Sequence, residues 1–275
     1  MAVAIITDTA ASLPADLAAE RDIDVLPMWL TVGGEPHRED EPGFEEAAGA
    51  DASTSGPTPG EFAEAIAAGL ERCEDGVVVL TIAAAMSSTH QAAVMAAHEV
   101  DGPVRVVDTE TAAGAEGLVV LAAAEAAASG ATLDEVVDVA GRVIERVRLV
   151  ATLPTLDYLV RSGRVPNVAG WAGRRLGINP LFEFRQGKIR RLLPARNQPA
   201  AVDRIVSAWR RSRVDGARLH VAALHALAPE TATDLLGQVE AEESPATSFV
   251  GEFGSVMVIH TGPGIAGLAW WWDDG

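Results

Sequence analysis

The chain has 275 residues, 48% of them hydrophobic, and a formal net charge of −18 at pH 7. A surface this acidic repels nucleic-acid phosphates, which argues against nucleic-acid binding. The length and the hydrophobic content favour two packed domains over a disordered chain, and no apolar run reaches the roughly 18–20 residues of a membrane span.

The N-terminal segment and the single cysteine indicate where the protein works. Met1 leads directly into an apolar strand-like run, without the basic region and the cleavage site of a secretory signal. Cys73 has no second cysteine with which to form a disulfide, and the histidines have none of the spacings typical of metal sites. We therefore expect a cytoplasmic protein with no metal and no cofactor.

Strand-like and helix-like segments alternate in the first half of the chain. Apolar runs predict strands, apolar residues three and four positions apart predict helices, and Thr132 and Glu135 have capping-box spacing. The turn-rich stretch 33–58 is expected to be a long loop, a kind that is usually functional or disordered. Strands are expected at 2–7, 23–32, 76–82 and 104–107, and helices at 9–19, 59–72, 88–99, 115–129 and 132–148. This alternation predicts a Rossmann-like parallel sheet with ligands at the carboxyl ends of its strands.

The second half of the chain has a different pattern, in which hairpins are mixed with two helices. A turn at 186–188 joins two short strands, as in an antiparallel pair. Strands are expected at 150–153, 181–185, 189–194, 219–224, 247–251 and 255–260, and helices around 200–213 and 229–242. We therefore expect an α/β protein with two domains, a Rossmann-like domain at 1–148 and an α+β domain with a mostly antiparallel sheet at 149–275.

Ser87, Ser88 and Thr89 follow a buried strand and open a helix. A helix N-terminus presents unpaired N–H groups and a partial positive charge, so an anion is a natural ligand there. Helix capping explains one of these hydroxyl groups equally well. The sequence thus leaves an anion site and a simple cap as even alternatives.

Three further segments carry polar side chains in suggestive positions. The Ser/Thr-rich stretch 53–58 precedes a helix, although such clusters are mostly ordinary loops. Arg161 and Arg164 flank a Ser-Gly turn and could pair with a phosphate or a carboxylate, or could simply be solvated. His260 is expected at the end of a strand, before a Gly-Pro-Gly turn.

Most arginines fall between Arg142 and Arg218, which indicates either a docking face for an acidic partner or solvated helix surfaces.

These pieces, in this order, resemble the DegV family of bacterial fatty-acid-binding proteins. The resemblance extends over nearly the whole chain, and the order of the motifs is more specific than any one of them. The matching motifs are Ile6-Thr7-Asp8-Thr9, Thr54-Ser55-Gly56-Pro57, Met86-Ser87-Ser88-Thr89-His90, Val107-Asp108-Thr109, Ser162-Gly163-Arg164 and His260-Thr261-Gly262-Pro263-Gly264. The resemblance implies a non-catalytic carrier of one long-chain fatty acid, palmitate-like or stearate-like, bound between two domains. It also implies a fatty acid kinase as partner, with transient contact with a membrane surface as a further option.

The same resemblance assigns roles to individual residues. Thr54 and Ser87 would hydrogen-bond the carboxylate of the fatty acid, with Ser55 and Ser88 close by. The residues facing the opening, and there the kinase or its transferred phosphoryl group, would be Arg164, Arg196 and His260. The chain departs from the family motifs at Gly56, Ser88 and His90 and at 83–85, where glutamine, glycine, tyrosine and Ile-Ser-Ser are usual.

Two other function classes compete with the carrier. One is a hydrolase that uses Ser87 or Ser88 with His260 and Asp8, although the chain lacks the Gly-x-Ser-x-Gly elbow of most α/β hydrolases. The other is a module that binds a small phosphate or sugar ligand at the hydroxyl-rich helix start.

Overall fold

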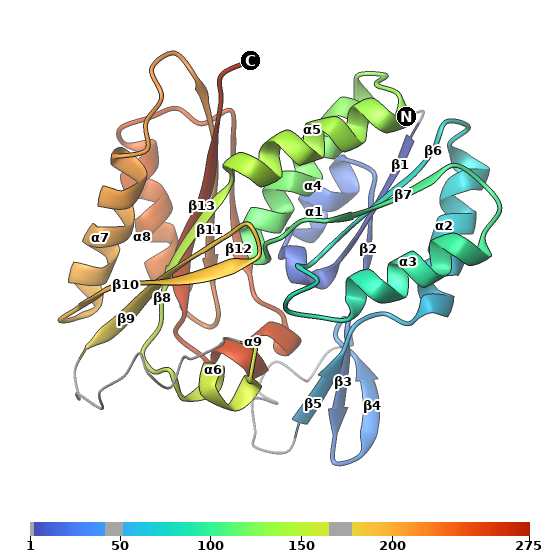
Figure 1. The fold of residues 1–275 in the computed structure, drawn as a ribbon. Coiled ribbons are helices and arrows are strands. Elements are labelled where there is room, and N and C mark those ends of the chain that lie inside the picture. The colour runs from blue at the N-terminus through green and yellow to red at the C-terminus, as the bar shows by residue number, and fades with distance from the viewer. Residues whose placement is uncertain (1–2, 42–51, 165–177) are drawn as a thin grey trace.

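The computed structural model describes residues 3–41, 52–164 and 178–275 and places two β-sheets side by side with helices between and outside them (Figure 1). The layers follow one another as helices, sheet, helices, sheet, helices. Three hydrophobic cores fill the spaces between these layers, and the central core contains residues from both halves of the chain. This arrangement confirms the α/β fold class, with two large sheets of different strand direction.

The first sheet is parallel throughout and has the strand order β2-β1-β6-β7. Every residue of β1 and β6 is buried, as expected for strands covered by helices on both faces. Its strands are β1 (Val3–Asp8), β2 (Ile23–Leu26), β6 (Gly76–Thr81) and β7 (Val104–Asp108). The chain leaves β1 through a 3₁₀ turn (Thr9–Ala11) and α1 (Ala15–Glu20).

Helices cover both faces of this sheet. The pair α2 (Pro59–Arg72) and α3 (Thr89–Glu99) packs on the outer face, and the pair α4 (Ala113–Ala128) and α5 (Leu133–Arg146) lies on the inner face (Figure 1). The expected capping box is confirmed, because the Thr132 side chain accepts a hydrogen bond from the Glu135 N–H while the Glu135 carboxylate accepts one from the Thr132 N–H. Helix α4 has no distinct polar face, since only Glu116 and Glu125 interrupt its small and apolar residues, and it packs against β1 on one side and β11 and β13 on the other.

The second sheet has six strands in the order β10-β9-β8-β13-β11-β12, and only β11 and β12 run parallel. The expected mostly antiparallel sheet is therefore confirmed. Its strands are β8 (Arg148–Thr152), β9 (Asn179–Arg185), β10 (Lys188–Ala195), β11 (Arg218–His225), β12 (Thr247–Glu252) and β13 (Ala266–Asp273). Helices α7 (Gln198–Arg210) and α8 (Pro229–Glu240) cover its outer face. The sequence patterns did not predict β13, although it occupies the middle of the sheet.

The stretch expected to be one long loop contains two strands instead. A small sheet with the order β4-β3-β5 is formed by β3 (Trp29–Val32), β4 (Glu35–Arg38) and β5 (Ala52–Ser55). Gly33 and Gly34 both have positive φ, which the tight turn between β3 and β4 needs and glycine adopts without strain. The polar composition of β4 and β5 hid these two strands from the hydrophobicity pattern, whereas β3 falls within the strand expected at 23–32. We call this small sheet the β3–β5 lobe.

Residues 255–260 form a helix, so the strand expected there is wrong. Helix α9 (Ser255–Thr261) packs against α6 (Asp157–Ser162) at the same end of the molecule as the β3–β5 lobe (Figure 1). Valine and isoleucine at 256, 258 and 259 favour strands by propensity. Here tertiary contacts override that preference, since the Val256 N–H at the helix start is bonded by the Glu39 carboxylate.

The predicted domain boundary near residue 148 falls at the first residue of β8 and stays a prediction. In the described part of the chain, no helix is both long and apolar enough to cross a bilayer.

Candidate functional site

A cavity of about 260 Å³ is lined by residues from the β3–β5 lobe, from the carboxyl side of the parallel sheet and from the six-stranded sheet. Its lining contains two sets of residues of opposite character. The apolar wall consists of strand residues of the six-stranded sheet, Leu149, Ala151, Phe182, Phe184 and Leu224. The polar wall consists of Thr54, Ser55, Ser87, Ser88, Arg164 and His260. Six of the seven site residues named by the sequence thus line one cavity.

The apolar wall follows from strand alternation. Leu149 pairs with Phe184 and Ala151 with Phe182 across β8 and β9, so their side chains lie on the same face of the sheet. Val150, between them, points to the other face and packs in the core under α7 and α8. These wall residues were not predicted from the sequence, although the Phe-Glu-Phe alternation at 182–184 is a signal for two of them.

The polar wall is assembled from segments far apart in the sequence. Ser87 and Ser88 follow the carboxyl end of β6, where a doubly wound sheet places its ligands. Thr54 lies in β5, Arg164 just after α6, and His260 in the last turn of α9. No local sequence pattern predicted that the β3–β5 lobe, α6 and α9 would meet.

A chain of hydrogen bonds joins three of these residues. The Thr54 Oγ1 and His260 Nε2 atoms are 2.7 Å apart, and Arg164 Nη1 lies 3.3 Å from His260 Nδ1. Arg164 is held in turn by a 3.0 Å bond from Nη1 to the Ser162 carbonyl. Burial, followed by the Arg164 charge, lowers the pKa of His260 to about 4, so the imidazole is neutral at pH 7.

The direction of these hydrogen bonds follows from the chemistry of arginine. A guanidinium group can only donate, so Nδ1 of the neutral His260 ring accepts and the ring proton is on Nε2. Nε2–H therefore donates to Thr54 Oγ1, and the hydroxyl hydrogen of Thr54 remains free to be donated to an anion in the cavity. A histidine in this tautomer offers Thr54 no basic nitrogen, so the pair is unsuited to activate a nucleophile.

Ser87 serves the helix start as well as the cavity. Its Oγ accepts a hydrogen bond from the Thr89 N–H at 3.3 Å and lies 2.8 Å from Thr89 Oγ1. Ser88 occupies the N-cap position of α3 without a side-chain cap bond. The N-cap side chain therefore makes no capping bond, whereas the Ser87 hydroxyl, one position earlier, accepts the Thr89 N–H and also lines the cavity.

Asp8, the third member of the hydrolase alternative, has other partners. Its carboxylate accepts hydrogen bonds from the backbone N–H groups of Ala10 and Ile82, each at 3.0 Å. It is fully buried, and this burial raises its pKa to about 7. The side chains bonded to His260 are Thr54 and Arg164, which is not the arrangement of a Ser-His-Asp triad.

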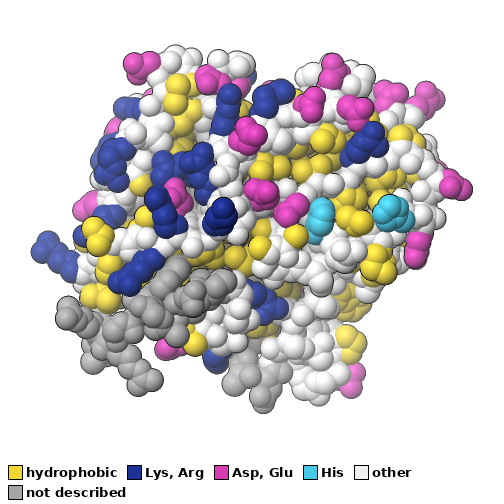
Figure 2. All heavy atoms as spheres, in the orientation of Figure 1, with side chains coloured by type: hydrophobic (Ala, Val, Ile, Leu, Met, Phe, Trp, Pro, Cys, Tyr) yellow, Lys and Arg dark blue, Asp and Glu magenta, His cyan; other side chains and the backbone are white. Residues whose placement is uncertain are grey.

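Arg196 is placed away from the cavity. It lines a separate surface hollow with Ile178, Pro194, Asp203 and Arg204. Figure 2 shows arginine and lysine side chains gathered over the part of the surface formed by β8–β10 and α7, whereas acidic side chains dominate elsewhere in this view. A neighbouring hollow on this basic face is lined by Arg148, Glu183, Arg185, Gln186, Lys188 and Arg190.

The departures from the family motifs have visible contacts. Gly56 lies so close to α3 that a Cβ on it would be 2.2 Å from Thr89 Oγ1, so the usual glutamine would require Thr89 to move. His90 Nδ1 lies 3.3 Å from Thr81 Oγ1 at the end of β6. Of these two residues, Gly56 lies against Thr89, whose hydroxyl is 2.8 Å from Ser87 Oγ.

The fold and the cavity define an α/β protein with two large sheets and an apolar pocket bordered by hydroxyl groups and a neutral histidine. A sequence model of the DegV family, described as uncharacterised protein, matches residues 2–272, and the chain belongs to this family. A DegV domain-containing protein of Streptomyces coelicolor is 36% identical over 277 residues, covering 97% of each chain.

Two further relatives carry a functional description. A Thermotoga maritima protein named fatty acid-binding protein is 29% identical over 282 residues, covering 98% of this chain and 97% of the relative. The solved structure of a DegV family protein from Thermus thermophilus, described by its fatty acid binding, matches with a TM-score of 0.90 and 29% identity. It covers 99% of this chain and 100% of that chain.

Proposed function

We propose that this protein is a fatty-acid-binding carrier that holds one long-chain fatty acid in its cavity. The observation that carries the proposal is the Arg164–His260–Thr54 chain, which leaves a hydroxyl donor facing a cavity whose opposite wall is apolar. The fatty acid binding described for the Thermus thermophilus and Thermotoga maritima relatives supports the same ligand class.

The two walls suit the two ends of such a ligand. Each buried methylene of the acyl chain contributes about 0.8 kcal/mol against the apolar wall. A buried carboxylate is tolerated only when its oxygens are hydrogen-bonded. Thr54 and Ser87 would supply these bonds, with Ser55 and Ser88 close by, and Arg164 and His260 would act through Thr54. Residues 1–148 would then carry the carboxylate site, and residues 149–275 would complete the pocket.

In this proposal the carrier has no catalytic residue of its own and works in the cytoplasm. It presents the carboxylate to a fatty acid kinase, which transfers a phosphoryl group from ATP to a carboxylate oxygen and gives an acyl phosphate and ADP. Arg164 and His260 would face this reaction. Arg196, on the basic face, would contact an acidic surface of the kinase.

Native mass spectrometry of the protein purified from cells tests the proposal. We expect one bound fatty acid of palmitate or stearate size, and an acyl hydroxamate after treatment of the loaded protein with ATP, the kinase and hydroxylamine. A stoichiometric sugar phosphate or nucleotide in place of the lipid would contradict the carrier. A bound lipid without hydroxamate would keep the carrier and remove the kinase from the proposal.

A further inference from the structure

Glu39 joins three parts of the molecule at the edge of the cavity. It follows β4, and its Oε1 accepts a 2.8 Å hydrogen bond from the Val256 N–H in the first turn of α9. Its Oε2 accepts a hydrogen bond from the Thr9 hydroxyl, at the end of β1. Thr9 Oγ1 in turn accepts a 3.1 Å bond from the Met28 N–H, and Glu39 donates its own N–H to the Met28 carbonyl. The β3–β5 lobe, the parallel sheet and α9 are thus linked through one carboxylate.

The start of α9 is shaped to receive this carboxylate. Its N-cap residue is Gly254, which offers no side chain for the free N–H groups of the first turn. A Cβ at Gly254 would lie 2.2 Å from Glu39 Oε1 and 2.6 Å from Glu39 Cδ. Glycine at this position therefore leaves the space that the Glu39 carboxylate occupies.

Glu39 also joins the two segments that carry Thr54 and His260, the residues of the shortest contact in the polar wall. Thr54 belongs to β5 and is paired with Leu30 of β3, in the same lobe as Glu39. His260 lies in the last turn of α9, the helix whose first turn Glu39 holds. The 2.7 Å contact between Thr54 and His260 therefore depends on how the lobe and α9 are held together.

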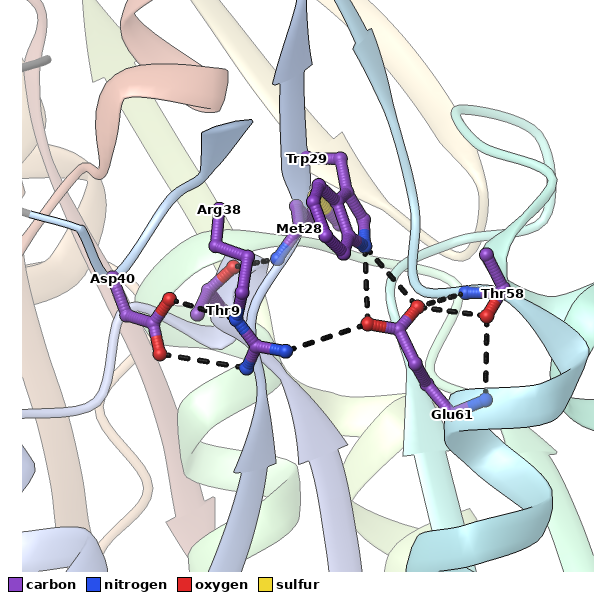
Figure 3. Close-up of polar contacts among 7 residues, drawn as sticks. All are labelled: Thr9, Met28, Trp29, Arg38, Asp40, Thr58 and Glu61. Atoms are coloured by element: carbon purple, nitrogen blue, oxygen red, sulfur yellow. Dashed lines mark hydrogen bonds and ion pairs between the residues drawn. The ribbon is translucent and has the colours of Figure 1, made fainter. Parts of the chain in front are cut away.

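The other side of the lobe is anchored separately. Figure 3 shows Glu61 of α2 accepting hydrogen bonds from Trp29 and Thr58 and pairing with Arg38, which also reaches Asp40. These contacts fix the lobe to α2 and do not involve α9. Removing the Glu39 carboxylate therefore releases the first turn of α9 and leaves these contacts between the lobe and α2 in place.

We propose that Glu39 is a positioning residue of the cavity, which holds α9 by its first turn and thereby keeps His260 against Thr54. The consequence for ligand binding rests on the proposed function, since it assumes that Thr54 hydrogen-bonds the carboxylate. The positioning itself is measurable without any ligand.

The test uses the full chain after removal of lipid and follows the His260 ring by NMR titration, with the signal assigned from its absence in His260→Ala. Glu39→Ala should raise the His260 pKa from about 4 towards its ordinary 6.5, by about one unit or more, because the released ring becomes hydrated. Loss of the negative charge of Glu39 alone would lower the His260 pKa. The direction of the pKa change therefore distinguishes a positioning role from a direct charge effect.

Two further variants test the same positioning role if Glu39→Ala folds poorly. Gly254→Ala keeps every charge and has an unstrained φ of −65°, but its methyl group displaces the Glu39 carboxylate, so it should raise the His260 pKa in the same direction. Glu39→Gln keeps an acceptor for Val256 and a donor for Thr9, so it should restore the low pKa. Asp40→Asn is the matched control, since Asp40 pairs with Arg38 and not with α9, and it should leave the titration unchanged.

Stearate affinity, measured by displacement of a fluorescent fatty acid, is the second readout. Glu39→Ala and Gly254→Ala should each weaken stearate about tenfold, which corresponds to one disturbed hydrogen bond of about 1.4 kcal/mol. A His260 pKa near 4 in both variants would overturn the positioning role. A raised pKa with unchanged stearate affinity would overturn its part in ligand binding, whereas a wild-type protein that binds no stearate would instead refute the carrier.

Discussion

The two walls of the cavity are built in opposite ways. The apolar wall consists of neighbouring residues on strand interiors, where Leu149 and Ala151 alternate with a residue of another core. The polar wall is made of side chains from four separate segments, and Thr54 and His260 are 206 positions apart. Strand pairing fixes the first wall, whereas single contacts between segments fix the second. We therefore expect the apolar wall to set how tightly a chain is held and the polar wall to recognise its headgroup.

The largest effect on ligand affinity is expected from a larger side chain in the apolar wall. Ala151→Phe places a ring in the space proposed for the acyl chain, so it should weaken palmitate binding on the order of 100-fold or more, measured by fluorescent-ligand displacement. Overpacking should also cost about 1–3 kcal/mol of folding free energy. Val150→Phe, one residue earlier and on the opposite face, should cost similar stability and leave palmitate affinity intact. Equal binding losses in both variants would show that the effect is on folding only.

A smaller effect is expected from the polar wall, and it should depend on the headgroup. Ser87→Ala removes a hydroxyl donor and should weaken palmitate by about 1–3 kcal/mol, the range for an unmet charged acceptor. Neutral 1-hexadecanol, titrated in the same displacement assay, should lose much less affinity. If the variant weakens both ligands equally, Ser87 does not distinguish a carboxylate.

The smallest effect concerns Ala113, the first residue of α4, which lines the cavity but belongs to neither wall. Its φ is +56°, a left-handed conformation that costs a non-glycine residue about 1–2 kcal/mol. Ala113→Gly should therefore stabilise the protein by about 0.5–1 kcal/mol in urea unfolding, after the entropy loss of glycine. Ala115→Gly, in regular helix, should destabilise it by about 1 kcal/mol or more. A loss of stability in Ala113→Gly would contradict the strain.

The sequence predicted best what depends on local patterns. The apolar runs of β1 and β6 and the capping box at Thr132 were confirmed because a strand covered on both faces and a helix start leave direct marks in the sequence. The order of motifs identified the family and brought Ser87, Thr54 and His260 into one hypothesis. Their meeting could not be derived, because β5 was hidden in a polar stretch and α9 has the composition of a strand. Arg196 shows the converse, because the resemblance grouped it with the other six site residues but it lines a different hollow.

Helix α4 has a consequence for how the protein unfolds. Twelve of its 16 residues are buried, and its apolar surface is covered by the parallel sheet on one side and by the six-stranded sheet on the other. Neither sheet can melt alone without exposing one side of this helix to water, so the two halves share a single cooperative transition. The backbone amides of α4 should accordingly exchange with deuterium only when the whole chain unfolds.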